Sequence, residues 1–334
     1  KLASTHRALA ELKGIASSIP NENILINTLG LQEAKDSSAI ENIITTHDDI
    51  YKAELNLKGF KSLNAKEIQN YIKALKIGFK QISKNKILTN NNIIEIQSIL
   101  EKNNAGFRKV PGTTLKNATT GKIVYTPPQD YKTIKKLMTN LEQFVNDETL
   151  SDFDPLVKMA IIHYQFESIH PFYDGNGRTG RIINVLYLVM NGLLDLPILY
   201  LSRYIIENKS DYYKLLQEIR ETDNWENWIL YLLNGIEVVA KETIALISKI
   251  KELNFEYKNL LRDNYKFYSQ DLLNNLFKHP YTKIEFIEND LGVSRITAAK
   301  YLNQLSRDGL LKKEKLGTGN YYINVKLIKL LILK

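Results

Sequence analysis

The residues best suited to chemistry lie in one run of twelve, residues 170–181, which reads His-Pro-Phe-Tyr-Asp-Gly-Asn-Gly-Arg-Thr-Gly-Arg. His170 carries an imidazole, the side chain that titrates closest to neutral pH. Asp174 supplies a carboxylate of the kind that Mg²⁺ prefers, and Arg178 and Arg181 supply two guanidinium groups. A base, a metal ligand and two cations so close together predict a site that handles phosphate groups.

The three residues between the acid and the arginines strengthen that prediction. Gly175, Asn176 and Gly177 precede a segment that we expect to be helical, and glycines let the backbone approach a bound anion closely. The first turn of a helix presents N–H groups and the positive end of the helix dipole to such an anion. Arg178 and Arg181 are three positions apart, so they project from one face and can grip successive phosphates.

His170 has two interpretations. As a general base, it would accept the proton of an attacking hydroxyl group. The spacing of His163, Glu167 and His170 also fits a metal cluster on one helical face. The spacing alone leaves both interpretations open. Zinc retained by purified protein would favour the cluster, whereas a base at His170 would leave His163 in a packing or supporting role.

The run resembles the signature of the Fic (filamentation induced by cAMP) domain family, His-Pro-Phe-x-Asp/Glu-Gly-Asn-Gly/Lys-Arg-x-x-Arg. The resemblance implies a mainly α fold, with an all-helical Fic core and a β-hairpin flap. It implies a nucleotidyltransferase that moves AMP from ATP to a Ser, Thr or Tyr hydroxyl of a protein, with Mg²⁺ as cofactor and pyrophosphate as leaving group. Gly177 stands where phosphorylating relatives have Lys, which favours adenylyl transfer, while another nucleotide and a phosphocholine donor stay open.

The resemblance also implies a role for each residue of the run. His170 becomes the general base and Asp174 the Mg²⁺ ligand. Arg178 would contact the β-phosphate and Arg181 the γ-phosphate. The residues expected to bind ATP are Gly175, Asn176, Gly177, Arg178, Thr179, Gly180 and Arg181, followed by Tyr204, Tyr212 and Tyr213, which either stack on adenine or belong to the core.

A second pattern of the family, Ser/Thr-x-x-x-Glu-Gly/Asn, is matched by residues 37–42. Ser37 and Glu41 are four positions apart, so we expect both on one face of a helix. The resemblance implies that Glu41 pairs with Arg181 and occupies the place of the terminal phosphate charge. The chain is then similar to the autoinhibited class with an N-terminal inhibitory helix, whose members also remove AMP in some cases.

A β-hairpin is expected between residues 110 and 128. The β-prone residues Ile123, Val124, Tyr125 and Thr126 form the predicted flap strand. Residues 119–121 are expected to make the turn, and two prolines end the strand. The resemblance implies that this strand pairs with the main chain of the target protein.

Two helices must position the run. Asp154 and Pro155 predict a helix start, and that helix should end near His170. The second helix should begin near Gly177 and stop at Gly192. The run would then form the turn between the two helices.

The domain order follows from these segments. We expect an N-terminal helical region with the inhibitory helix at 1–94, the Fic catalytic domain at 95–234, a helical linker at 235–262 and a winged helix-turn-helix at 263–334. The last part rests on helices at 284–291 and 295–307 and on strands at 310–315 and 320–325 around a glycine-rich turn. An alternative function is therefore a DNA-binding regulator whose Fic domain is a sensor.

Composition narrows the setting. The 334 residues carry a net charge of +8, and residues 262–334 carry 13 basic and 7 acidic residues, which permits DNA or an acidic protein as a partner of that part. The chain has no Cys, which fits a cytoplasmic protein and excludes disulfides. No apolar run approaches the length of a membrane span. The expected partner is a protein substrate, with the chain itself among the candidates, and a homodimer stays open.

Overall fold

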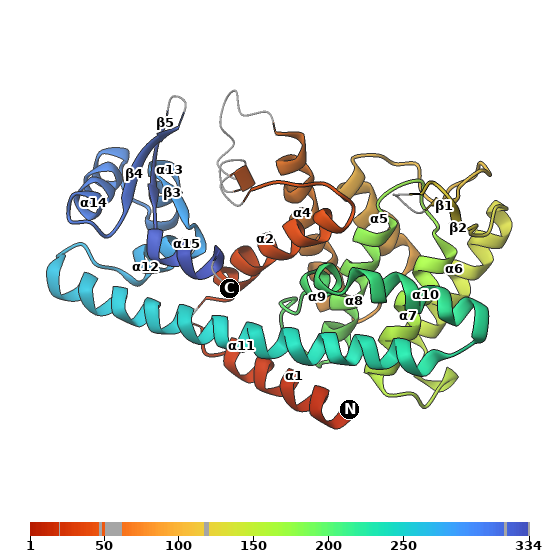
Figure 1. The fold of residues 1–334 in the computed structure, drawn as a ribbon. Helices are drawn as coiled ribbons and strands as arrows, with labels where there is room; N and C mark the ends of the chain where they lie inside the picture. Colours follow the sequence, from red (N-terminus) through yellow and green to blue (C-terminus); the bar gives the residue numbers. More distant parts are fainter. Residues whose placement is uncertain (20, 47–48, 51–61, 117–119, 317–318, 333–334) are drawn as a thin grey trace. The chain divides into compact units, whose positions relative to one another are not determined.

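The computed structural model describes the whole chain except residues 20, 47–48, 51–61, 117–119, 317–318 and 333–334 (Figure 1). The described residues form two compact units that are not consecutive along the chain. Unit 1 contains residues 1–10 and 70–239, and unit 2 contains residues 11–69 and 240–334. Both units are mostly helical, so the prediction of a mainly α fold is confirmed.

Unit 1 contains the run and the helices that hold it. Three of its helices continue into unit 2, namely α1 (Leu2–Ala16), α4 (Leu63–Asn85) and α11 (Trp225–Asn264). The helices that lie wholly within unit 1 are α5 (Asn90–Glu101), α6 (Tyr131–Asn146), α7 (Pro155–Ile169), α8 (Asn176–Met190), α9 (Ser202–Glu207) and α10 (Lys209–Thr222), with a short 3-10 helix at Glu148–Leu150.

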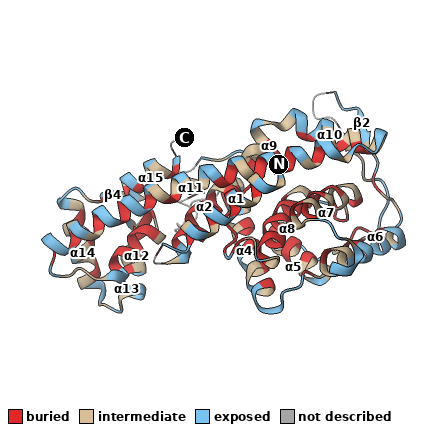
Figure 2. Cartoon of the chain, turned by 90° about the horizontal axis from the view of Figure 1, so that it is seen from below, coloured by how far each residue is buried: buried red, intermediate tan, exposed pale blue. Residues whose placement is uncertain are grey.

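The central pair of unit 1 is α7 and α8, which pack against each other. Every residue of α8 from Arg178 to Val189 is buried, and Figure 2 shows both helices mostly in the colour of buried residues. A helix that is buried on all sides must be covered all round by its neighbours. The run therefore sits on the most constrained pair of helices in the unit.

The ends of this pair are as predicted. The side chain of Asp154 accepts a hydrogen bond from the N–H of Leu156 (2.9 Å), and Pro155 is the first residue of α7. Helix α7 ends at Ile169 with His170 as its C-cap. Helix α8 begins at Asn176, one residue earlier than expected, and ends just before Gly192, which adopts a positive φ of 68°.

The predicted hairpin is present as two short antiparallel strands, β1 (Leu115–Lys116) and β2 (Ile123–Tyr125). Leu115 pairs with Tyr125, and Lys116 pairs with Ile123. Strand β2 ends one residue before the predicted end, so Thr126 already lies outside it. Part of the predicted turn, Thr119, lies outside the described residues.

Unit 2 combines α2 (Glu22–Ile40) with the C-terminal part of the chain. Helix α2 packs against α12 (Gln270–Lys278) and α15 (Val325–Ile332), and Gln32 Nε2 donates a hydrogen bond to the carbonyl of Leu331 (2.5 Å). The predicted helices at 284–291 and 295–307 are present as α13 (Ile284–Leu291) and α14 (Arg295–Arg307).

A three-stranded sheet completes unit 2. Strands β4 (Lys312–Leu316) and β5 (Gly319–Ile323) form the predicted hairpin, and residues 317–318 between them lie outside the described part. An unexpected strand, β3 (Tyr281–Lys283), pairs with β5, so the strand order is β3-β5-β4. The strand predicted at 320–325 was too long, because β5 ends at Ile323 and Val325 begins α15. The winged helix assignment and DNA binding stay predictions.

Across the described ranges, no helix is both long enough and apolar enough to cross a membrane.

Candidate functional site

Residues 170–175 form the turn between α7 and α8, and both ends of this turn adopt left-handed backbone conformations. His170 has φ 48° and ψ 59°, and its N–H still donates to the carbonyl of Phe166 (3.0 Å). Gly175 has φ 75° and caps the start of α8. A left-handed conformation is uncommon for a residue with a side chain, so the surroundings must hold His170 in place.

Asn176 braces this turn with its side chain. Its Oδ1 accepts from the N–H of Phe172 (2.9 Å), and its Nδ2 donates to the carbonyl of the same residue (2.8 Å). The Asn176 side chain is buried. The side chain of Asn176 therefore braces the turn, while its backbone N–H lies at the start of α8.

The start of α8 has the geometry of an anion site. The N–H of Thr179 donates to the carbonyl of Gly175 (2.9 Å), which is the first bond of the helix. The N–H groups of the preceding turn, including those of Asn176 and Gly177, have no carbonyl partner within the helix. A side chain at Gly175 would be strained by the positive φ of 75°, and its Cβ would lie 2.9 Å from Cγ and Cδ of Glu101, so Glu101 would have to shift.

Asp174 stands at the outer edge of this anion site. Its side chain is 75% exposed, and its Oδ1 accepts from the N–H of Gly175 (2.7 Å). In the described part of the chain, no three or more His, Cys, Asp or Glu residues form a metal cluster, so the alternative with His163 and Glu167 as ligands finds no support. One exposed carboxylate fits Mg²⁺, which is commonly held by one or two carboxylates together with substrate phosphates.

Arg178 is buried and paired. Its Nη2 lies 2.8 Å from Oε1 of Glu101, the last residue of α5, and the two side chains are 3% and 13% exposed. Asp174 Oδ1 is farther from the same nitrogen, at 3.9 Å. Glu101 thus holds the guanidinium group beside the turn. The sequence prediction missed Glu101, because no local pattern marks a residue so far from the run.

A buried polar cluster on α7, α8 and α10 lies within electrostatic reach of Arg181. His163 is fully buried, with its Nε2 2.9 Å from the hydroxyl of Tyr212, and its Nδ1 accepts from Nδ2 of Asn184 (3.0 Å). Because Nδ1 accepts, Nε2 carries the proton and donates to Tyr212. Burial, together with the positive charge of Arg181, lowers the pKa of His163 to about 3, so this imidazole is neutral.

The cluster changes the interpretation of several predicted ATP contacts. Tyr212 is 3% exposed and bound to His163, so it is a core residue and has no free ring face for adenine. Thr179 is fully buried, and a Cβ on Gly180 would lie 2.7 Å from Oε1 of Glu167, so both are packing positions.

The two other predicted adenine contacts border the same cluster, since the ring of Tyr213 lies 5.2 Å from that of Tyr212. Tyr213 is 49% exposed. The half-buried Tyr204 packs its ring against Tyr231 and close to Gly235. Exposure therefore leaves Tyr213 as the better candidate for stacking.

The predicted inhibitory residues, Ser37 and Glu41, do not both lie within one helix as expected. Ser37 is fully buried within α2, but the helix ends at Ile40, and Glu41 is its C-cap rather than a residue of the helix. Carbonyl groups make a helix C-terminus negative, so a carboxylate there favours a cationic partner. Glu41 belongs to unit 2 and Arg181 to unit 1, and the pairing of the two stays a prediction.

The sequence prediction also missed Arg108, a fully buried arginine that contacts the run. Its Nε donates to the carbonyl of His170 (2.8 Å), and its backbone N–H donates to the carbonyl of Pro171 (2.8 Å). An isolated Arg in a loop gives no sequence signal for such a role. The backbone of the predicted base is therefore held from outside the run.

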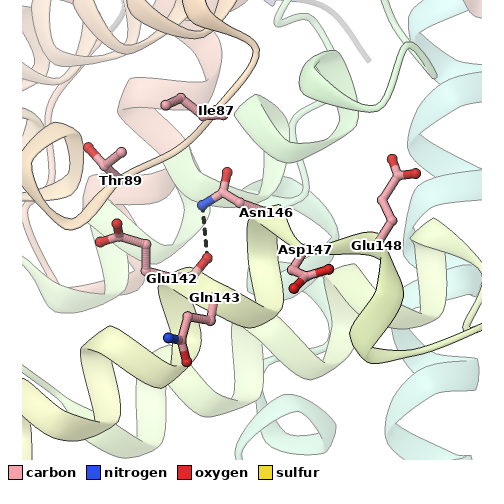
Figure 3. A pocket seen from close by; sticks show the side chains of 7 residues that line it. All are labelled: Ile87, Thr89, Glu142, Gln143, Asn146, Asp147 and Glu148. Atoms are coloured by element: carbon pink, nitrogen blue, oxygen red, sulfur yellow. Dashed lines mark hydrogen bonds between the residues drawn. The ribbon is translucent and has the colours of Figure 1, made fainter.

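A surface hollow lies apart from the run, and several of its polar groups form hydrogen bonds within the protein (Figure 3). Asn146 Nδ2 donates to the carbonyl of Glu142 (2.8 Å), and its Oδ1 accepts from the N–H of Leu88 (2.9 Å). Glu142 Oε2 accepts from the N–H of Asn90 (2.6 Å). These groups cap local backbone, so the run remains the candidate site. The hollow is lined by Ile87, Thr89, Glu142, Gln143, Asn146, Asp147 and Glu148.

Three family models match the chain. Residues 1–80 match the model described as Fic/DOC family N-terminal, and residues 87–188 match Fic/DOC family. Residues 255–327 match the model described as protein adenylyltransferase SoFic-like, C-terminal domain. Together these models cover more than half of the chain.

Curated relatives and a solved structure agree with these models. The chain is 40% identical over 81 residues to the probable protein adenylyltransferase aq_aa38 of Aquifex aeolicus, covering 24% of each chain. It is 33% identical over 144 residues to protein adenylyltransferase fic-1 of Caenorhabditis briggsae, covering 42% of this chain and 27% of the relative. It thus spans about a quarter of the length of these relatives. A Fic family protein from Desulfovibrio desulfuricans has the same fold, with a TM-score of 0.60, 18% identity and coverage of 96% and 95%.

Proposed function

The chain belongs to the Fic family, and from this premise we propose that it transfers AMP from ATP to a hydroxyl group of a protein. The observation that carries the proposal is the complete run at 170–181, with a histidine at one end of the turn and the start of α8 at the other. Curated relatives named protein adenylyltransferase match the chain over part of its length, which supports the same activity.

In the proposed reaction, the α- and β-phosphates bind at the start of α8. Backbone N–H groups of Asn176 and Gly177 face the phosphates, and the helix dipole favours the negative charge. Gly177 has no side chain to interfere with this approach. The guanidinium group of Arg178, held beside the turn by Glu101, places positive charge near the β-phosphate, and Arg181 binds the terminal phosphate.

His170 acts as the general base in this proposal. Its imidazole removes the proton of the target hydroxyl, whose oxygen forms a bond to the α-phosphorus. The bond from that phosphorus to the bridging oxygen breaks, and pyrophosphate leaves. Mg²⁺ held by Asp174 would neutralise charge on the phosphates. AMP remains on the target.

The proposed target contact is strand β2. Ile123 and Val124 are 59% and 44% exposed, and an extended target segment could add to this short sheet through main-chain hydrogen bonds. Such pairing aligns a hydroxyl without requiring a particular target sequence. The target is therefore proposed as an extended Ser, Thr or Tyr segment of a protein, this chain included.

Glu41 supplies the proposed brake. Its carboxylate would occupy Arg181 and keep the γ-phosphate from its productive position. The position of Glu41 at the negative end of α2 supports a cationic partner. Relief of this pairing would then release the activity, and the same carboxylate would orient water if AMP is removed again.

Three forms of the chain test the proposal together. The unmodified chain, Glu41→Gly and Glu41→Gly with His170→Ala are incubated with ATP and Mg²⁺, and AMP addition is measured by intact mass. We expect a gain for Glu41→Gly and no addition once His170 is replaced. No gain for Glu41→Gly would refute the brake, and transfer without His170 would refute its role as base.

A further inference from the structure

The segment between α5 and α6 carries the hairpin and is tied back to the turn of the run. Residues 106–130 contain β1 and β2, and five hydrogen bonds join them to residues 168–173. We call this set of contacts the flap latch and define it by Arg108, Tyr125 and Tyr173.

Arg108 is the central member of the flap latch. Its Nε donates to the carbonyl of His170 (2.8 Å), while its Nη2 donates to the carbonyl of Pro128, three residues beyond β2. Its backbone N–H donates to the carbonyl of Pro171 (2.8 Å). A guanidinium group is planar and rigid, so one side chain fixes the distance between the hairpin end and the base.

Tyr125 forms the second contact from within β2. Its hydroxyl donates to the carbonyl of Ser168 (2.9 Å), two residues before His170. The guanidinium carbon of Arg220 lies 3.8 Å from the centre of the Tyr125 ring, in a cation–π arrangement. Arg220 also donates to Oγ of Ser168 (3.4 Å), so it holds Tyr125 and Ser168 together.

In the third contact the side chain belongs to the turn, at Tyr173, and the backbone belongs to the segment before the hairpin. Its hydroxyl accepts from the N–H groups of Lys109 (2.9 Å) and Val110 (3.1 Å). These two residues follow Arg108 directly, so the segment that leads into the hairpin is held at the same turn. The turn and the hairpin thus share hydrogen bonds in both directions.

We propose that Arg108 and Tyr125 are positioning residues that couple the hairpin to His170, so that a target strand bound on β2 aligns the base. The inference rests on the proposed function for its catalytic consequence. Its physical basis is the left-handed backbone of His170, which its own side chain disfavours. Bonds from Arg108 to the carbonyls of His170 and Pro171 hold that backbone, and the same guanidinium group holds the hairpin.

The test uses the full chain with Glu41→Gly, into which Arg108→Lys or Tyr125→Phe is introduced. Lysine keeps the charge but cannot donate from two fixed directions. Phenylalanine keeps the ring over Arg220 and removes only the bond to Ser168. The matched controls are Arg203→Lys, at an arginine paired with Glu207 on α9, and Tyr131→Phe, at the start of α6.

Two measurements are made on each variant. Hydrogen exchange is followed at the amides of residues 108–110 and 170, whose N–H groups bond within or beside the flap latch. Transfer to a protein target gives kcat and KM, and titration gives the Kd of a non-hydrolysable ATP analogue. A general loss of folding would raise exchange throughout unit 1, whereas the flap latch predicts a local rise.

We expect both variants to raise exchange at these amides while the controls do not. Arg108→Lys should lower kcat by about 10- to 100-fold with an unchanged Kd for the ATP analogue, because the base is misaligned. Tyr125→Phe should raise KM for the target by about 3- to 10-fold, the effect of losing one hydrogen bond. If Arg108→Lys does not fold, Tyr125→Phe carries the test.

The outcomes separate the flap latch from the proposed function. If the Glu41→Gly parent transfers no AMP but the two variants still raise hydrogen exchange locally, the proposed function is refuted and the flap latch is supported. An active parent chain whose two variants match the controls in exchange, kcat and KM would overturn the flap latch.

Discussion

His163 is a fully buried, neutral imidazole. The free energy of unfolding should therefore fall when the pH is lowered, and replacing His163 by glutamine should remove this part of the pH dependence. The pKa of His163 is lowered from 6.5 to about 3, because burial and the charge of Arg181 disfavour its protonated form. The unfolded chain binds a proton below pH 6.5, whereas the folded chain does so only near pH 3. The contribution of neutral His163 to the free energy of unfolding is therefore fully present above pH 6.5 and is lost as the pH falls toward 3.

The size of the effect follows from these two values. At pH 5, protonation of the unfolded chain lowers the free energy of unfolding by about 2 kcal/mol, and the full loss below pH 3 is about 5 kcal/mol. In His163→Gln, the new amide can still donate to Tyr212, while the titrating group is gone. The variant is less stable at pH 7.5, because it loses the ring that stacks on Trp228, but its stability depends less on pH.

Urea unfolding followed by tryptophan fluorescence measures this difference. Both tryptophans of the chain, Trp225 and Trp228, lie at the start of α11 in unit 1 and report on that unit. Between pH 7.5 and 5, the parent chain should lose about 2 kcal/mol more than His163→Gln. Equal slopes for the parent and His163→Gln would refute the assignment of a buried neutral imidazole.

Three further substitutions test the site. Glu101→Gln should lower the free energy of unfolding by about 3 kcal/mol in the same assay, because the buried Arg178 loses its counter-charge; an unchanged stability would contradict the buried pair. Asn176→Ala should cost about 2 kcal/mol and abolish transfer, since both bonds to Phe172 disappear; wild-type transfer would show that the brace is dispensable. Tyr212→Phe should cost about 1 kcal/mol and leave the calorimetric affinity for ATP unchanged, whereas a lost affinity would restore Tyr212 as an adenine contact.

The elements around the run could be predicted because their signals are local. Asp154 and Pro155 mark the start of α7 by a cap and a fixed φ, and Gly192 marks the end of α8 by its positive φ. The hairpin was predictable for a similar reason, since β-prone residues are followed by two prolines. The predicted end of the first helix near His170 and the predicted start of the second near Gly177 then placed the residues between them in the turn.

The supporting contacts could not be predicted, because they join residues far apart in sequence. Arg178 forms an ion pair with Glu101 on α5, and His163 forms a hydrogen bond with Tyr212 on α10. Neither partner lies in a recognisable sequence pattern. A tyrosine at helical spacing fits either the core or a ligand, and only its burial decided for the core. Glu41 fell one residue beyond its predicted helix, since the last turn gave no sequence signal for its end.

The most direct measurement of the central claim follows the two ends of ATP separately. Glu41→Gly is incubated with a protein target, Mg²⁺ and ATP labelled either at the α-phosphate or at the γ-phosphate. Adenylyl transfer predicts that the α-label stays on the target and the γ-label leaves with pyrophosphate, and that neither label is bound when His170 is also replaced by Ala. A γ-label on the target, or an α-label that persists without His170, would contradict the account.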